Sequence, residues 1–320
     1  IDLGNLNSFD VLDNVIYDNE SGGISASTQG SSPGILSGNE IYNNFNFGID
    51  GFGSGIVIEN NTIYGHTRNS FARGIDLGAG IARDNSIYGN TDGIRLDIRA
   101  TAKNNRVYGN TEAGIITSDF DGETIDGNYI YSNAIGSHID RGDNDRIINN
   151  LVYANADQGV LLEDVSDIFF RNNTVYHPVG NAIEIIDGSR DMDIRNNIFW
   201  VNAGFTIRLS SNSQTGLVLD NNLFNLGDDP NARIGDFGGT FIDTLASWQS
   251  TTGYDAVSIF DDPNFFDIDG ADDVFAYVDI GGTFVNGGLD DYFHLLKNSP
   301  AIDRGVYIAT PVTDLIGDPR

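Results

Sequence analysis

One short phrase recurs along the first two thirds of this chain and constrains its fold more than any other feature. The copies read DNVIYDN, GNEIYNN, NNTIYGH, DNSIYGN, NNRVYGN, GNYIYSN, NNLVYAN, NNTVYHP, NNIFWVN and NNLFNLG. The asparagine at the second place returns every 20 to 25 residues, at Asn14, Asn39, Asn61, Asn85, Asn105, Asn128, Asn150, Asn173, Asn197 and Asn222. A period of this length is typical of solenoids, in which each repeat forms one coil.

Each repeat contains short segments of strand type. A β-branched or aromatic residue follows the asparagine after one place, and a tyrosine usually comes next, as in Ile63-Tyr64. A second strand begins in most coils at a glycine followed by isoleucine or valine: Gly23-Ile24, Gly48-Ile49, Gly74-Ile75, Gly93-Ile94, Gly114-Ile115 and Gly159-Val160. Such short strands cannot bury their own apolar faces, so the coils must stack and pair in parallel. We therefore predict an all-β fold, a parallel β-helix of about ten or more coils.

The repeated asparagines have a structural interpretation. Identical side chains one layer apart can hydrogen-bond along the stack, and they can satisfy turn backbone that would otherwise be buried without a partner. We therefore assign them to the fold and not to chemistry.

The period divides the chain into three parts. Residues 1–225 are predicted to form the regular coils. Residues 226–291 break the period and are rich in aspartate, so they are predicted to form an acidic, loop-rich insertion with isolated strands. Residues 292–320 are predicted to close the same domain with one or more coils.

Charge and composition exclude several classes of partner. The 46 acidic residues outnumber the 17 basic ones, and the formal charge of −29 would repel nucleic acid and anionic membranes. No stretch reaches the roughly 18 apolar residues of a membrane span, and the absence of cysteine excludes disulfides and thiolate chemistry. We expect a secreted, extracellular monomer that binds neither nucleic acid nor membranes.

The pattern N-x-[IV]-Y-x-N followed by G-[IV], over residues 10–225, closely resembles the repeats of the right-handed parallel β-helix superfamily, the pectin-lyase-like proteins. The tail, with Tyr292-Phe293-His294-Leu295 and Ser299-Pro300-Ala301-Ile302-Asp303, looks like the closing coils of large secreted bacterial members. The resemblance implies a right-handed solenoid. It implies a range of functions, from pectate and alginate lyases and mannuronan epimerases to glycosidases and surface proteins without chemistry. The Asp-Pro-His-Glu signature of the mannuronan epimerases is absent.

A ladder of outward side chains is expected on one parallel sheet, at the position after the inward isoleucine. In successive coils this position reads Ser25, Asp50, Asp76, Arg95, Ile116, Asp140, Leu161, Glu184 and Arg208. The ladder predicts two acid–arginine clusters, one of Asp76, Arg95 and Asp97 and the other of Glu163, Glu184 and Arg208. Carboxylates at this spacing can bind calcium or act as an acid and a base, and arginine can hold a sugar carboxylate or sulfate. The alternative is surface ion pairs worth less than about 1 kcal/mol.

We interpret Asp76 and Arg95 as catalytic candidates, together with His138 and Asp140. The segment from Gly136 to Arg141 places His138 at the start of the exposed ladder, where it can act as a general base toward a uronate, with Tyr131 or another tyrosine as proton donor. The alternative is that His138 caps a turn.

The remaining ladder residues are candidates for substrate binding: Asp97, Arg141, Glu163, Glu184 and Arg208. Twelve of the 15 arginines lie between Arg68 and Arg208, so an anionic polymer would bind to the middle coils.

Calcium is the one cofactor that the sequence points to, and no organic cofactor is expected. The segment Asp267-Ile268-Asp269-Gly270, with Asp272 close behind, resembles half of a calcium-binding loop. A solvated acidic loop is the alternative.

Three functions follow from these features. The first is a polysaccharide-active enzyme, a lyase or epimerase acting on a uronic-acid glycan by proton abstraction, with arginine or calcium neutralising the developing charge. The second is a non-catalytic glycan- or calcium-binding module of a larger surface protein. The third is a glycosidase with paired carboxylates.

Overall fold

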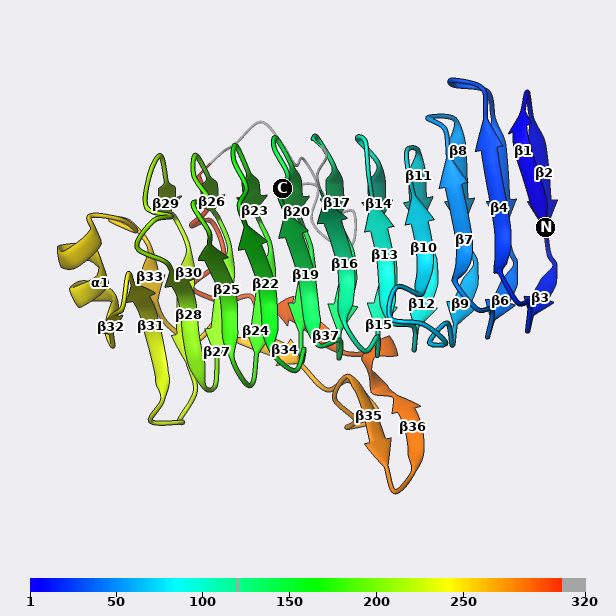
Figure 1. Ribbon diagram of the computed structural model, residues 1–320. Helices are drawn as coiled ribbons and strands as arrows, with labels where there is room; N and C mark the ends of the chain where they lie inside the picture. The colour runs from blue at the N-terminus through cyan, green and yellow to red at the C-terminus, as the bar shows by residue number, and fades with distance from the viewer. Residues whose placement is uncertain (119–120, 307–320) are drawn as a thin grey trace.

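The chain winds into a parallel β-solenoid of about ten turns, which a computed structural model describes over residues 1–118 and 121–306 (Figure 1). Each turn contributes one strand to each of three sheets, so hydrogen-bonded neighbours are three strands apart in sequence. These sheets are called sheet A, with 12 strands, sheet B, with 10, and sheet C, with 11. The predicted all-β parallel solenoid is confirmed.

The strands of the solenoid are short. Sheet A consists of β1 (Asp2–Leu6), β4 (Gly22–Thr28), β7 (Phe47–Phe52), β10 (Arg73–Leu77), β13 (Asp92–Leu96), β16 (Ala113–Ser118), β19 (Ile135–Asp140), β22 (Gln158–Glu163), β25 (Asn181–Ile186), β28 (Gly204–Leu209), β31 (Ala232–Phe237) and β32 (Thr240–Ile242). Sheet B consists of β2 (Phe9–Leu12), β5 (Gly34–Ser37), β8 (Ile56–Glu59), β11 (Ile81–Arg83), β14 (Thr101–Lys103), β17 (Thr124–Asp126), β20 (Arg146–Ile148), β23 (Phe169–Arg171), β26 (Asp193–Arg195) and β29 (Val218–Asp220). Sheet C consists of β3 (Val15–Tyr17), β6 (Glu40–Tyr42), β9 (Thr62–Tyr64), β12 (Ser86–Tyr88), β15 (Arg106–Tyr108), β18 (Tyr129–Tyr131), β21 (Leu151–Tyr153), β24 (Thr174–His177), β27 (Ile198–Val201), β30 (Leu223–Leu226) and β33 (Ile259–Phe260).

The core is a column of aliphatic side chains along the solenoid axis. In sheet C the β-branched residue of each repeat points inward, and Ile63, Ile87 and Val107 are fully buried in register. In sheet A the isoleucine after the glycine does the same, as Ile75 and Ile94 show. Alternation along each strand then sends the next residue outward.

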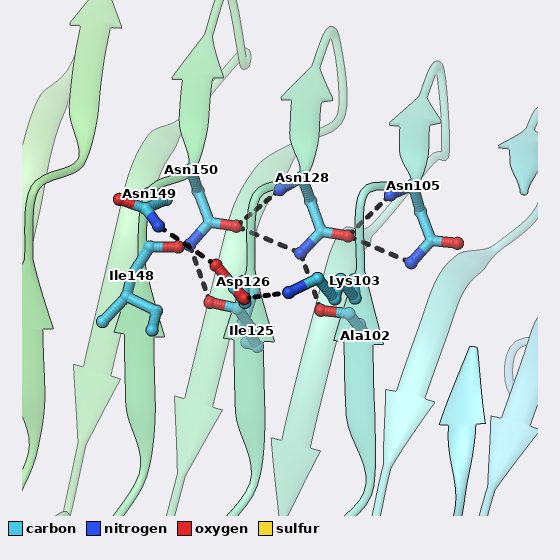
Figure 2. Close-up of polar contacts among 9 residues, drawn as sticks. All are labelled: Ala102, Lys103, Asn105, Ile125, Asp126, Asn128, Ile148, Asn149 and Asn150. Carbon is cyan, nitrogen blue, oxygen red and sulfur yellow. Dashed lines mark hydrogen bonds and ion pairs between the residues drawn. The ribbon is translucent and has the colours of Figure 1, made fainter. Parts of the chain in front are cut away.

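The predicted asparagine ladder runs through the turn between sheets B and C (Figure 2). Asn128 is fully buried, and its Oδ1 accepts hydrogen bonds from the backbone N–H of Asn105 at 2.9 Å and from the Asn105 side chain at 3.0 Å. Its Nδ2 donates to the carbonyl oxygen of Ala102 at 2.9 Å and to Asn150 Oδ1 at 3.0 Å. Every hydrogen-bonding group of this amide therefore serves the stack, which confirms its structural role.

The end of the stack differs from the regular coils. β32 pairs antiparallel with β31, and helix α1 (Leu245–Thr252) lies at that end of the solenoid (Figure 1). Trp248 of α1 is fully buried in the main hydrophobic core, and its Nε1 donates to Asp255 Oδ2 at 2.9 Å. The helix and its tryptophan thereby cover the last coil, as capping elements of solenoids do.

The rest of the chain folds back onto the outer face of sheet C. This segment contains β34 (Phe265–Asp267), β35 (Tyr277–Ile280), β36 (Thr283–Asn286), the 3-10 helix η1 (Gly287–Leu289) and β37 (Tyr292–Leu295). The outward tyrosines of sheet C stack with ring centroids 4.9 to 5.0 Å apart from Tyr17 to Tyr153. The segment packs on this stack, with Tyr277 against Tyr108 and Phe293 against Tyr153.

The three-part division of the chain stays a prediction. Residues 307–320 of the predicted closing coils lie outside the described residues, and β37 pairs antiparallel with β34.

Candidate functional site

The outward side chains of sheet A form two rows across its strands. The first row, in register, is Ser25, Asp50, Asp76, Arg95, Ile116, His138, Leu161, Glu184, Arg208 and Asp236. The second row, two residues further along the strands, includes Ser118, Asp140, Glu163 and Ile186.

The sequence-based ladder is wrong at one coil. It placed Asp140 in the first row, whereas the structure has His138 there and Asp140 in the second row. The cause is Ser137, which is buried at the inward position that Ile115 and Val160 hold in the neighbouring coils. Serine interrupts the pattern of inward isoleucines. The sequence pattern therefore assigns the inward position to Ile139, which is the next inward residue of the strand.

The register brings His138, Asp140 and Glu163 together on the outer face of β19 and β22. The Nε2 atom of His138 lies 2.9 Å from Glu163 Oε2. One imidazole nitrogen and one carboxylate oxygen from each acid all lie within 4.8 Å of one another. All three side chains are partly exposed, so the cluster is fixed in the sheet and open to a ligand.

Arg141 stands directly beside this cluster. Its guanidinium contacts both carboxylate oxygens of Asp140, with Nη2 2.8 Å from Oδ2 and Nε 3.2 Å from Oδ1. The arginine side chain is about half exposed, so its charge lies at the surface where an anionic group can approach.

Glu163 stands one coil before Glu184, as the sequence predicts, and its carboxylate contacts His138. Glu184 and Arg208 do pair, at 2.7 Å. Glu184 is almost fully buried, and its Oε2 accepts hydrogen bonds from the side chains of Gln158 and Asn181. A carboxylate with so many partners fixes the guanidinium of Arg208, which remains about half exposed.

Asp76 and Arg95 are neighbours in register, as predicted, but each forms its ion pair within its own strand segment. Asp76 pairs with Arg73 at 2.7 Å, and Arg95 pairs with Asp97 at 3.1 Å. Burial raises the pKa of Asp97 to about 6, against the opposing effect of Arg95. The three predicted residues are thus divided between two separate ion pairs on neighbouring strands.

The polar groups of sheet A are separated by apolar residues. Ile116 lies between the Arg95 and His138 positions, and Leu161 lies between His138 and Glu184. Since parallel strands are about 4.8 Å apart, Arg95 and Glu184 each lie about 10 Å from the His138 position. The face therefore offers three polar groups spaced along one line.

Tyr131 and the three predicted calcium-binding aspartates lie away from this face of sheet A. Tyr131 is fully buried under the C-terminal segment on sheet C, where its hydroxyl donates to Asn286 Oδ1 at 2.9 Å, so it is not the proton donor of this site. Asp272 Oδ1 accepts a hydrogen bond from the backbone N–H of Val274 at 2.9 Å. Partial burial and the neighbouring carboxyl of Asp269 raise the pKa of Asp267. A calcium site at these three aspartates stays a prediction.

The donor set of the His138 cluster also fits a divalent cation. An imidazole and two carboxylates are ligands that zinc or manganese accepts, whereas calcium prefers oxygen atoms alone. The three residues that could hold such an ion are His138, Asp140 and Glu163.

Within residues 1–118 and 121–306, no helix is long and apolar enough to cross a membrane.

Known structures share the fold at low sequence identity. Tailspike protein 2 of Escherichia coli O157:H7 bacteriophage CAB120 has a TM-score of 0.51 and 12% identity, and the alignment covers 70% of this chain and 37% of the tailspike. The A-module of Azotobacter vinelandii mannuronan C-5 epimerase AlgE6 has a TM-score of 0.50 and 12% identity, with coverage of 82% and 92%. XylC in complex with xylose has a TM-score of 0.50 and 13% identity, with coverage of 98% and 58%.

Sequence comparison assigns the family. Among curated proteins, no sequence matches the chain. The family described as "Right handed beta helix region" matches residues 1–121 and 78–224, which are the coils of the solenoid. The chain therefore belongs to the right-handed parallel β-helix proteins, as its repeats predicted.

Proposed function

We propose that the outer face of sheet A binds an acidic polysaccharide and that His138, Asp140 and Glu163 carry out a lyase or epimerase reaction on its uronic acid units. The observation that carries the proposal is the cluster itself, an imidazole in contact with one carboxylate and close to a second, on an open face beside Arg141. The fold shared with a mannuronan C-5 epimerase module supports a polysaccharide as ligand.

The chemistry follows from the hydrogen bond between His138 and Glu163. In the tautomer that donates Nε2–H to the Glu163 carboxylate, the lone pair of the imidazole lies on Nδ1. That nitrogen removes the proton from the carbon next to the sugar carboxylate, and Glu163 stabilises the imidazolium that forms. Arg141, which Asp140 holds in place, neutralises the charge that grows on the sugar carboxylate. In a lyase, the C–O bond to the next sugar then breaks as the carbon–carbon double bond forms, and the imidazolium or water protonates the leaving oxygen. In an epimerase, water returns a proton to the same carbon from the opposite face.

The test is incubation of the purified chain with polymannuronate, polygalacturonate, a sulfated glycan and a neutral glycan. Unsaturated products report a lyase, and NMR of the sugar stereochemistry reports an epimerase. His138→Gln is expected to lower kcat by about 100-fold or more, because general base catalysis contributes that much. Equal turnover by this variant, or no product from any polymer, would overturn the proposal.

A matched control separates the site from general effects of charge. Asp140→Asn removes a carboxylate that is 20% exposed on sheet A, and Asp126→Asn removes one that is 17% exposed on sheet B, where it pairs with Lys103. We expect a large loss of turnover from the first variant and none from the second.

A second candidate is a non-catalytic module that holds a divalent cation at the same cluster. One possible ligand atom from each of His138, Asp140 and Glu163 lies within 4.8 Å of the other two, which favours this candidate. Titration of the purified chain with Zn²⁺ or Mn²⁺ tests it, and binding that disappears in Glu163→Gln without turnover of any glycan would favour this candidate over the enzyme.

A further inference from the structure

A small pocket with aromatic walls lies on the outer face of sheet A, closer to the N-terminus than the His138 cluster. It has a volume of about 620 Å³ and is a shallow depression, more open to solvent than enclosed. Its walls include Phe45, Phe47, Phe71, Asn69, Arg73 and Asp76. The reaction proposed for the His138 cluster does not involve these aromatic residues.

The loop that carries Phe71 is held in place by its own hydrogen bonds. Asn69 Oδ1 accepts the backbone N–H of Phe71 at 2.7 Å. The Asn69 side chain donates to the carbonyl oxygen of Phe45 at 3.1 Å and to Asn46 Oδ1 at 2.7 Å. The loop is thereby tied to the equivalent turn of the preceding coil, and the backbone of Phe71 is fixed although its side chain is 74% exposed.

Two polar side chains of β10, Arg73 and Asp76, line the pocket beside its aromatic residues. Arg73 donates to Asp76 Oδ2 at 2.7 Å, and both side chains are partly exposed. Since a guanidinium has five N–H donors and a carboxylate has several acceptor sites, this pair can still donate to and accept from hydroxyl groups. The charges of Arg73 and Asp76 compensate each other, and Asp50, the neighbour of Asp76 in the first row, adds one further carboxyl group.

Aromatic rings beside a pair of donors and acceptors fit the two surfaces of a pyranose. The sugar has an apolar face of C–H groups that can pack on a phenylalanine ring, and it has a rim of hydroxyls that needs hydrogen-bond partners. A specific protein–protein interface buries about 800 Å² on each partner, whereas a pocket volume of about 620 Å³ is in the range of sites that hold a small ligand.

We propose that this pocket binds one pyranose unit of the polysaccharide that lies on sheet A, with Phe71 as the stacking residue and Arg73 and Asp76 as hydroxyl partners. This inference rests on the proposed function for the identity of the polymer. β10, which carries Asp76, is three strands away from β19, which carries His138. At about 4.8 Å per strand the two positions are about 14 Å apart, so a chain of several linked sugars spans them.

The test compares binding of oligosaccharides of increasing length by isothermal titration calorimetry. The probes are oligomannuronates, oligogalacturonates and xylo-oligosaccharides, from disaccharides to octasaccharides, with His138→Gln as background so that turnover does not interfere. Phe71→Ala is expected to weaken binding of the longest bound probe by about ten-fold, and Phe71→Trp is expected to restore it. Phe284→Ala is the matched control, since this ring is 65% exposed on the β36 strand outside sheet A.

The outcomes distinguish this inference from the proposed function. Unchanged affinity of Phe71→Ala for every probe, or equal losses for Phe71→Ala and Phe284→Ala, would overturn the pocket as a sugar site even where the chain turns over a polymer. Binding that depends on Phe71, together with no turnover of any polymer by the chain with His138 intact, would support the pocket and contradict the enzyme.

Discussion

Replacement of Asn128 by alanine is expected to lower the free energy of unfolding by on the order of 4 kcal/mol, because the change leaves several buried groups without partners. The backbone N–H and side-chain amide of Asn105 lose their acceptor, and the carbonyl oxygen of Ala102 and Asn150 Oδ1 lose a donor. Each buried unsatisfied group costs about 1–3 kcal/mol, and relaxation of the turn recovers part of the sum.

Urea unfolding followed by circular dichroism measures this loss, with Asn14→Ala as the matched control. Asn14 stands in the first coil and is partly exposed, and its side chain donates to Leu12 and Asn39. The described residues contain no hydrogen bond to its Oδ1, so its removal leaves fewer groups unsatisfied and should cost about 1 kcal/mol. Equal losses for the two variants would show that the ladder does not carry the stability assigned to it.

The same asparagines explain why so much of the fold was predictable from the sequence. A solenoid repeats one local environment, so the inward positions, the turn asparagines and the outward tyrosines recur with the coil period. Ile63 and Ile87, for example, occupy the same buried position in successive coils. Periodicity predicts these residues because each of them depends on its equivalents in neighbouring coils.

The candidate site was less predictable because it depends on departures from the period. Ser137 stands where the neighbouring coils have an inward isoleucine or valine. The isoleucine pattern is therefore shifted by two residues in this coil, and it predicts Asp140 in the first row in place of His138. The glycine at Gly136, aligned with Gly114 and Gly159, was the signal that could have corrected the register. The burial of Tyr131 could not be predicted, because a non-periodic segment more than 130 residues away in sequence covers it.

A second departure from the period lies inside the core beneath the turn between sheets A and B. Glu123 and Asp145 are each only 1% exposed, in positions where neighbouring coils have the buried Ala100 and Ile168. Glu123 Oε1 accepts the backbone N–H of Arg99 at 2.9 Å, and Asp145 Oδ1 accepts the N–H of Glu123 at 2.8 Å. The other oxygens, Glu123 Oε2 and Asp145 Oδ2, are buried without another partner, so we expect the two side chains to share one proton.

This pair makes stability depend on pH in a defined direction. Burial, together with the hydrogen bond and the charge of Glu123, raises the pKa of Asp145 to about 9. An unfolded aspartate releases its proton near pH 4, so between about pH 4 and 9 the folded state binds a proton that the unfolded state lacks. The contribution to stability is fully present below about pH 4 and is lost as the pH rises toward 9, by up to about 1.4 kcal/mol per pH unit.

Asp145→Asn is expected to remove this dependence. The amide keeps an oxygen for the backbone N–H groups and supplies a permanent N–H to Glu123 Oε2, so it replaces the proton at every pH. The free energy of unfolding of the variant, measured in urea, should therefore exceed that of the wild type by an amount that grows steadily from pH 5 to pH 8. Glu123→Gln should behave in the same way, because either amide donates to the remaining carboxylate. The double variant should be less stable than either single one, since neither side chain then carries the charge that favours the bond. A difference between Asp145→Asn and the wild type that stays constant with pH would mean that no proton is shared in the folded chain.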